Sequence, residues 1–410
     1  MSAAKVFLSR LARRVWFRAA LFTLVAIAYA LLIGWIGPLL PFSPTLDLGQ
    51  GAIDSILQIL ATSMLAVTTF SLTAMVTAYS SAARIATPRA TQLLVEDRTS
   101  QNVLSTFVGS FAYSLVGIVA LSTGYYPEQS RTLLFLGTLV VVVIIIVTLL
   151  RWIAHLANFG RMSDIISRVE KAAGDTLAQY ARRPALGARP LRATPPSALP
   201  VYAASPGFVT NIDLGTLERV AESASIEVHI IATAGRTANS RTPLAHVVGT
   251  LNDDTADALR DAFHVEAHRS YDQDPRLGVI ALSEIGSRAL SPATNDPGTA
   301  IDALAALERV FTLMAEQERD EELLYPHLWL SPVSLEDLID DGFRPIARDG
   351  AAMIEVGLRV QKVLASLAAM SPQNYRLFRR AAASAERRGA ASLNREDARA
   401  LRDACRSLWR

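Results

Sequence analysis

The chain of 410 residues has only one cysteine, Cys405. A single cysteine excludes a disulfide within one chain and a zinc site built from several cysteines. The formal net charge is only +2, so the chain lacks a strongly basic footprint and we expect no nucleic-acid partner. Charged residues are also missing from the centre of each long apolar run, which argues against a buried carboxylate proton relay.

The common sequence signatures of enzymes are missing as well. The sequence has no Walker-type phosphate loop, no Gly-x-Gly-x-x-Gly pattern and no Gly-x-Ser-x-Gly nucleophile turn. These absences leave no positive indication of an enzyme, and we expect no cofactor.

The first part of the chain is rich in long apolar runs. A helix needs about 20 apolar residues to cross a hydrocarbon core about 30 Å thick. Four runs approach or exceed that length, and they cover residues 19–37, 52–79, 104–124 and 132–154. We therefore predict four transmembrane helices within residues 1–155, with the lipid bilayer as their surroundings.

Basic residues are unevenly distributed among the connecting segments. They precede the first run and follow the second and fourth: Lys5, Arg10, Arg13, Arg14, Arg18, Arg84, Arg89, Arg98, Arg151, Arg161, Arg168 and Lys171. The loop at 38–51 has no lysine or arginine, and the loop at 125–131 has only Arg131. The positive-inside rule then predicts cytoplasmic N and C termini and two short outside loops.

The rest of the chain has no comparable run and divides into three segments. Residues 156–206 begin as a helix that should continue the fourth span, and end in a connector with six prolines and four arginines. Proline lacks an N–H donor, so we expect irregular structure there. Residues 207–251 predict a small β module, and residues 252–410 a helical cytoplasmic domain. The predicted fold class is an α-helical integral membrane protein with a C-terminal cytoplasmic α+β domain.

Individual elements follow from the local patterns in these segments. Predicted strands cover residues 208–209, 228–231 and 244–248, with a helix at 214–223. Further helices are predicted at residues 254–268, 275–290, 298–319, 334–340, 346–370, 373–388 and 394–409.

The second apolar run is rich in hydroxyl side chains. Five of them recur at spacings of 7, 7, 4 and 7 and share one helical face: Ser55, Thr62, Thr69, Thr73 and Ser80. Small hydroxyl residues permit close helix packing and can bond back to the i−4 carbonyl. The same face could instead line a polar path in an oligomer, and both interpretations stay open at this point.

Residues 288–300 form the densest polar signature. Ser291-Pro292 should end one helix, and Asp296-Pro297 has the form of an N-cap followed by proline at the first helical position. This corner is either purely structural or a site for a ligand or a subunit contact, with these candidate residues: Arg288, Ser291, Asn295 and Asp296. His264 and His268 have an i, i+4 spacing and so would share one helical face. Two histidines at this spacing can hold zinc only with a third ligand, and the sequence indicates none, so we expect a solvated helix face rather than a metal site.

Three segments resemble a known bacterial family. They include Thr87-Pro88-Arg89 in the first, Ser205-Pro206-Gly207-Phe208-Val209 in the second, and Arg288-Ala289-Leu290-Ser291-Pro292 with Asn295-Asp296-Pro297 in the third. Together they resemble the family catalogued as domain of unknown function 2254, whose members are described only as predicted membrane proteins. The resemblance covers roughly residues 15–315 and implies a multi-pass protein of the bacterial inner membrane.

Two functions remain after these exclusions. The leading hypothesis is a channel-like or transporter-like protein, assembled as a homo-oligomer because four helices rarely enclose a pore alone, with a cytoplasmic domain for gating or assembly. The alternative is a membrane-anchored scaffold or sensor whose cytoplasmic domain binds a protein or a small ligand. The two hypotheses differ in whether the hydroxyl face of the second run lies against the other spans.

Overall fold

The computed structural model describes residues 15–36, 50–95, 97–191 and 193–410. Its contacts divide the chain into two compact units. The bundle unit contains the described helices up to Arg84 and from Gln92 to Arg161, and the sheet unit contains Ile85–Thr91 and Met162–Arg410. The basic residues before position 15 and most of the predicted outside loop at 38–51 fall outside the described residues.

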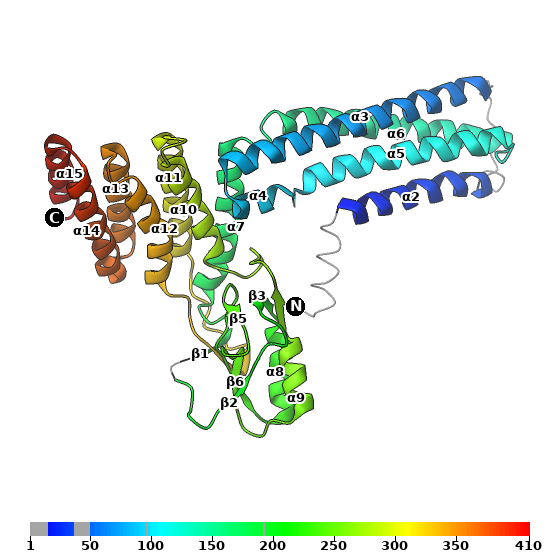
Figure 1. Ribbon diagram of the computed structural model, residues 1–410. Coiled ribbons are helices and arrows are strands. Elements are labelled where there is room, and N and C mark those ends of the chain that lie inside the picture. Colours follow the sequence, from blue (N-terminus) through cyan, green and yellow to red (C-terminus); the bar gives the residue numbers. More distant parts are fainter. Residues whose placement is uncertain (1–14, 37–49, 96, 192) are drawn as a thin grey trace. The chain divides into compact units, whose positions relative to one another are not determined.

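The bundle unit consists of long helices that lie side by side (Figure 1). The helices of this region are α2 (Val15–Ile36), α3 (Gln50–Ile85), α4 (Pro88–Val95), α5 (Arg98–Ser122) and α6 (Glu128–Leu156). Among the described residues, three segments are long and apolar enough to cross a membrane: Ala52–Arg84, Pro88–Ser122 and Ser130–Leu156. The chain is therefore a membrane protein with several apolar helices. The apolar part of α2, Ala19–Trp35, is shorter, so the fourth span stays a prediction.

Close packing holds the bundle unit together. Two buried clusters join its helices, and the larger side chains in them include Ile53, Leu57, Phe107, Tyr113, Tyr126, Leu134 and Trp152. Glycines on α5 allow close approach: a Cβ at Gly109 would lie 3.4 Å from the backbone of Phe22. Small residues at such contacts matter because lipid supplies no hydrophobic force between helices.

The prediction that the fourth span continues as one helix past residue 158 is wrong. The helix α6 ends at Leu156, and α7 (Met162–Arg182) starts after a turn. Gly160 in this turn has a φ of +76°, a left-handed conformation that glycine adopts without steric cost. The two helices belong to different units, with α7 in the sheet unit.

Two sheets occupy one part of the sheet unit. Their strands are β1 (Ala188–Pro190), β2 (Leu199–Val201), β3 (Gly207–Ile212), β4 (Glu227–Ile230), β5 (Thr237–Ala238), β6 (Ala245–Val248), β7 (Phe263–Glu266) and β8 (Tyr325–Leu330). The larger sheet has the order β1-β8-β4-β6-β2, in which β8 is parallel to β1 and β4 while β6 is antiparallel to β4 and β2. The smaller sheet has the antiparallel order β5-β3-β7. The three predicted strands are confirmed as parts of β3, β4 and β6.

The proline-rich connector is not irregular throughout, which corrects the prediction. It contributes β1 and β2, the two edge strands of the larger sheet. An edge strand tolerates proline because one side of it needs no donor for a neighbouring strand. Pro190 and Pro200 lie in these two edge strands.

Helices make up the rest of the sheet unit. After α7 they are α8 (Leu214–Ala224), α9 (Asp253–Asp261), α10 (Leu277–Ala289), α11 (Pro297–Ala315), α12 (Leu335–Asp349), α13 (Ile354–Met370), α14 (Tyr375–Ser392) and α15 (Arg395–Leu408). The helices α8 and α9 pack on the sheet core through Leu217, Ala221 and Leu259. The helices from α10 to α15 form a row (Figure 1).

The predicted helix boundaries are clearly wrong in two places. The predicted helix at 254–268 ends at Asp261, and the chain then forms β7 against β3. The segments predicted at 334–340 and 346–370 instead divide into α12 and α13, because Pro345 lies inside α12 rather than at its end. Phe343 and Ile346 are buried on either side of this proline, so packing holds the helix together.

Candidate functional site

The five candidate hydroxyl residues all lie on α3 and are exposed in the single chain: Ser55, Thr62, Thr69, Thr73 and Ser80. The other side of α3 is buried, and five of its residues each follow a hydroxyl residue by two positions: Leu57, Met64, Ser71, Met75 and Ala82. Two residues turn an α-helix by about 200°. The hydroxyl face therefore points away from the helices that pack on α3.

The hydroxyl groups on this face bond back to their own helix. Thr62 Oγ1 donates to the carbonyl of Gln58 and Thr69 Oγ1 to that of Leu65, each at 2.9 Å. Thr73 Oγ1 donates to the carbonyl of Thr69 at 3.0 Å. Each hydroxyl proton points inward, so the oxygen lone pairs remain available to water, to a hard cation or to another helix.

The outward surface of α3 differs from that of α6. The most apolar 18-residue stretch of α3 has a mean hydropathy of 1.8 and is 17% buried. The matching stretch of α6 has a mean hydropathy of 3.2 and is 22% buried. The two helices are about equally exposed, but α6 is far better suited to lipid.

The four candidate corner residues meet at the turn between α10 and α11. Asn295 has a φ of +48°, which asparagine tolerates better than most residues. Asp296 is confirmed as the N-cap of α11: it accepts the amide N–H of Thr299 at 3.0 Å and the Thr299 hydroxyl at 2.6 Å. These two hydrogen bonds hold the pKa of Asp296 below its usual value, and the bond from the Thr299 hydroxyl contributes more than the bond from the amide. Arg288 is exposed and Ser291 half-buried at the same turn.

We expect Asp296→Ala to lower the free energy of unfolding by about 0.5–2 kcal/mol, because the N-cap is lost. Asp302→Ala on the exposed side of the same helix should change it by less than about 0.5 kcal/mol. Melting of the full chain in detergent measures both variants. If Asp296→Ala melts like the Asp302→Ala control, the cap does not stabilise the corner.

Arg89, in the first segment of the family resemblance, is held within the sheet unit. Arg89 forms an ion pair with Glu284 of α10. The Tyr271 hydroxyl donates a hydrogen bond to the backbone carbonyl of Arg89 at 3.0 Å. Residues Ile85–Thr91, which directly follow the bundle part of α3, are thus fastened to α10 and to the loop before it.

His264 and His268 do not share a helical face, contrary to the prediction. His264 lies in β7, and His268 follows that strand in a turn. Among the described residues, no group of three or more His, Cys, Asp or Glu side chains could hold a metal ion.

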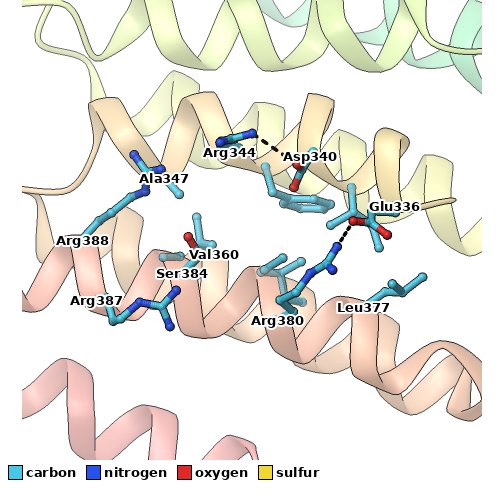
Figure 2. Close-up of a pocket in the computed structure, with 15 residues that line it drawn as sticks. Glu336, Asp340, Arg344, Ala347, Val360, Leu377, Arg380, Ser384, Arg387 and Arg388 are labelled. Carbon is cyan, nitrogen blue, oxygen red and sulfur yellow. Dashed lines mark hydrogen bonds and ion pairs between the residues drawn. The ribbon is translucent and has the colours of Figure 1, made fainter. Parts of the chain in front are cut away.

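A groove with four arginines is a feature that the sequence analysis missed. It lies among α12, α13 and α14 and has a volume of about 380 Å³ (Figure 2). Its guanidinium groups belong to Arg344, Arg380, Arg387 and Arg388. The high density of arginine in residues 375–392 was the one sign of this groove in the sequence. It could not reveal the groove by itself, because α12, which is distant in sequence, forms the other side.

A second cavity of about 380 Å³ lies where the parallel strands β4 and β8 end. Ligands commonly bind at the carboxyl ends of parallel strands. In this protein the charged groups are mostly paired with one another: Arg269 with Asp274, and Arg276 with Asp337 and Asp341. The cavity therefore offers fewer free charges than the arginine groove.

Comparisons with curated proteins find similar chains in mycobacteria. Uncharacterized protein Mb1321c of Mycobacterium bovis is 25% identical over 286 residues, which are 64% of this chain and 53% of that protein. Uncharacterized protein Rv1290c of Mycobacterium tuberculosis gives the same values. The chain thus spans about half the length of the curated relatives it matches. No solved structure matches it.

A family model agrees with the resemblance seen in the sequence. The model described as "Predicted membrane protein (DUF2254)" matches residues 12–366, which is most of the chain. The match includes α3, the corner and the start of the arginine groove, but not α14. The chain therefore belongs to the family of predicted membrane proteins catalogued as domain of unknown function 2254.

Proposed function

We propose that this protein is channel-like or transporter-like and acts as a homo-oligomer in a bacterial inner membrane. In this proposal the hydroxyl faces of α3 from several copies line a polar path. One observation carries it: the hydroxyl face lies opposite the packing face of α3, so no side chain among the described residues covers it. A path needs polar groups around its whole circumference, and one copy supplies a single face.

The contrast between α3 and α6 supports a second copy rather than lipid as that partner. If both helices faced lipid, both would be expected to have similarly apolar surfaces. Between residues 136 and 150 the large exposed side chains of α6 are all hydrocarbon: Leu136, Leu139, Val140, Val143, Ile144, Ile146, Val147 and Leu150. The exposed surface of α3 also carries large apolar side chains, among them Ile59, Leu65 and Phe70, but hydroxyl groups lie between them along its length.

The attachment of the segment after α3 supports a gating or assembly role for the sheet unit. Arg89 and its backbone carbonyl are held by Glu284 and Tyr271 within that unit. A shift of α10 or of the loop before it would move Ile85–Thr91, and with it the end of α3. A ligand or partner that acts on the sheet unit could therefore change the path.

The proposal includes cytoplasmic N and C termini, which rest on the arginine and lysine distribution. Pro127, at the start of α6, should then face the outside. A cysteine at this position, in a Cys405→Ser background, should react with an impermeant maleimide in intact cells. Reaction only after permeabilisation would reverse the orientation.

The experiment for conduction uses Thr69, which lies near the middle of α3. Wild-type protein in liposomes should conduct small ions, and Thr69→Val should lower the flux severalfold because an apolar constriction favours dewetting. Thr69→Asp should assemble normally and shift selectivity toward cations. Liposome flux and oligomer yield measure these effects.

Val143→Asp on α6 is the matched control for the aspartate. Val143 is 59% exposed near the middle of α6, where a carboxylate in lipid costs about 2.5–3.5 kcal/mol. This variant should lose insertion or assembly. If Thr69→Asp also fails to insert or assemble, or if the intact wild-type oligomer conducts no better than empty liposomes, the hydroxyl face of α3 does not line a polar path.

The alternative function is a membrane-anchored scaffold or sensor whose sheet unit binds a protein or a small ligand. The arginine groove is the observation that favours it. An intact oligomer that conducts no ions but binds a ligand in this groove would place this function ahead.

A further inference from the structure

The arginine groove has an uneven distribution of charge. Figure 2 shows that two of its guanidinium groups are engaged: Arg380 pairs with Glu336, and Arg344 pairs with Asp340 at 3.3 Å. Arg387 makes no hydrogen bond or ion pair with any residue that the structure describes, and the same holds for Arg388. The groove therefore has two free positive charges beyond those that its own carboxylates neutralise.

The free charges lie beside open space rather than against a packed wall. The side of α14 that lines the groove carries the small residues Ala381, Ser384 and Ala385 at helical spacing. In Figure 2, Arg387 and Arg388 lie at the same end of the groove, next to Ser384, and Arg388 extends toward Ala347 of α12. Larger side chains at the small positions would fill the volume between α12 and α14.

Apolar side chains form the other part of the lining. Ala347 of α12 and Leu377 and Ala381 of α14 are half-buried along the groove, while Phe343 and Val360 are buried beneath it. A ligand that fits must therefore satisfy guanidinium groups on one side and cover hydrocarbon on the other. The volume of about 380 Å³ falls in the range of about 300–1,000 Å³ that is usual for sites of small organic ligands.

We propose that this groove is a binding site for an organic phosphate, that is, a phosphate or diphosphate group carried on an apolar or aromatic body. Guanidinium groups match phosphate oxygens in geometry and charge and can bind them through two parallel hydrogen bonds. Arg387 and Arg388 hold the phosphate, and the half-buried Ala347, Leu377 and Ala381 contact the organic body. This site is independent of conduction, so it stands or falls separately from the path along α3.

The test is calorimetric titration of the full chain in a nonionic detergent. The probes are ADP, inorganic pyrophosphate, and the soluble short-chain lipids dihexanoyl-phosphatidylglycerol and dihexanoyl-phosphatidylcholine. ADP should bind more tightly than pyrophosphate, because pyrophosphate leaves the apolar lining uncovered. Binding of the phosphatidylglycerol probe in place of ADP would assign the same chemistry to a lipid headgroup, and the phosphatidylcholine probe controls for the acyl chains.

Two double variants that remove the same number of positive charges distinguish binding in the groove from a general effect of the protein's charge. Arg387→Gln with Arg388→Gln should weaken binding at least about tenfold, since hydrogen bonds to charged groups contribute about 1.5–3 kcal/mol and about 1.4 kcal/mol is a factor of ten. Arg376→Gln with Arg399→Gln removes two exposed arginines outside the groove and should change affinity by less than about twofold.

A third variant tests the cavity without changing its charge. Ser384→Leu should abolish binding because leucine fills the space between α12 and α14. If this variant does not fold, the arginine pairs alone decide, and their melting temperatures should equal that of wild type. Equal weakening by both arginine pairs, or no binding of any of the probes to folded wild-type protein, would overturn the proposal.

Discussion

Replacing Asp274 by alanine should cost about 3–5 kcal/mol of the free energy of unfolding, more than the substitutions in the corner. Asp274 is only 2% exposed and accepts two hydrogen bonds from Arg269, at 2.6 and 2.9 Å. It also accepts the backbone N–H groups of Arg276 and Leu277, at 3.0 and 3.1 Å, where α10 begins. Alanine leaves a largely buried guanidinium and two amides without their acceptor.

A double-mutant cycle in detergent checks the origin of this loss. Arg269→Ala alone should also be strongly destabilising, because it leaves a buried carboxylate without its cation. The double variant Arg269→Ala with Asp274→Ala should lose clearly less than the sum of the two single losses. Additive losses, or an Asp274→Ala melting temperature equal to that of the exposed control Asp302→Ala, would show that the pair does not stabilise this unit.

The second large effect is expected at Gly278, where α7 and α10 approach each other closely. A Cβ at this position would lie 2.7 Å from Cα of Ala173, closer than real side chains come. The neighbour is backbone, so one of the helices must shift. We expect Gly278→Ala to lower the free energy of unfolding by about 1–3 kcal/mol through overpacking.

Gly357→Ala is the matched control for this substitution. Gly357 also lies within a helix, but its added Cβ would meet only the Leu401 side chain, at an ordinary 3.5 Å. Alanine in a helix interior is favoured over glycine by about 0.5–1 kcal/mol, so this variant should be as stable as wild type or more so. Thermal melting of both variants should move in opposite directions. A shift of the same size and sign for both would mean that the close approach of α7 and α10 has no energetic effect.

The membrane helices could be predicted from the sequence because apolar runs of this length have few alternatives. The face of α3 was readable as well, since spacings of 7 and 4 fix which residues share a helical side. The direction in which that face points was not readable, because it depends on Leu57, Met64 and Met75 packing against other helices. Spacing defines faces, and tertiary contacts decide which face is inside.

The sheet unit shows where local patterns fail. The strand β8 lies between α11 and α12 and carries proline and histidine, yet it pairs with β1 and β4 from much earlier in the chain. Likewise β1 and β2 contain prolines, which these strands tolerate because both lie at an edge of the sheet. Edge or centre is a property of the whole sheet, so no local window reveals it.

The arginine groove could not be predicted for the same reason. Arg344 and Arg388 are far apart in sequence and face a common space only because α12 and α14 pack on opposite sides of it. By contrast, the cap at Asp296 was predicted correctly because it depends on neighbours within three residues. Short-range hydrogen bonds were readable from the sequence, and long-range cavities were not.

Disulfide cross-linking in native membranes tests most directly whether the hydroxyl face of α3 meets a second copy. In a Cys405→Ser background, single cysteines would replace Thr62 or Thr69 on α3, or Val143 on the equally exposed α6. Mild oxidation should yield covalent dimers from the two α3 positions and little or none from Val143→Cys. Dimers from Val143→Cys as abundant as those from the α3 positions, or no dimers from α3 at all, would contradict a path shared between copies.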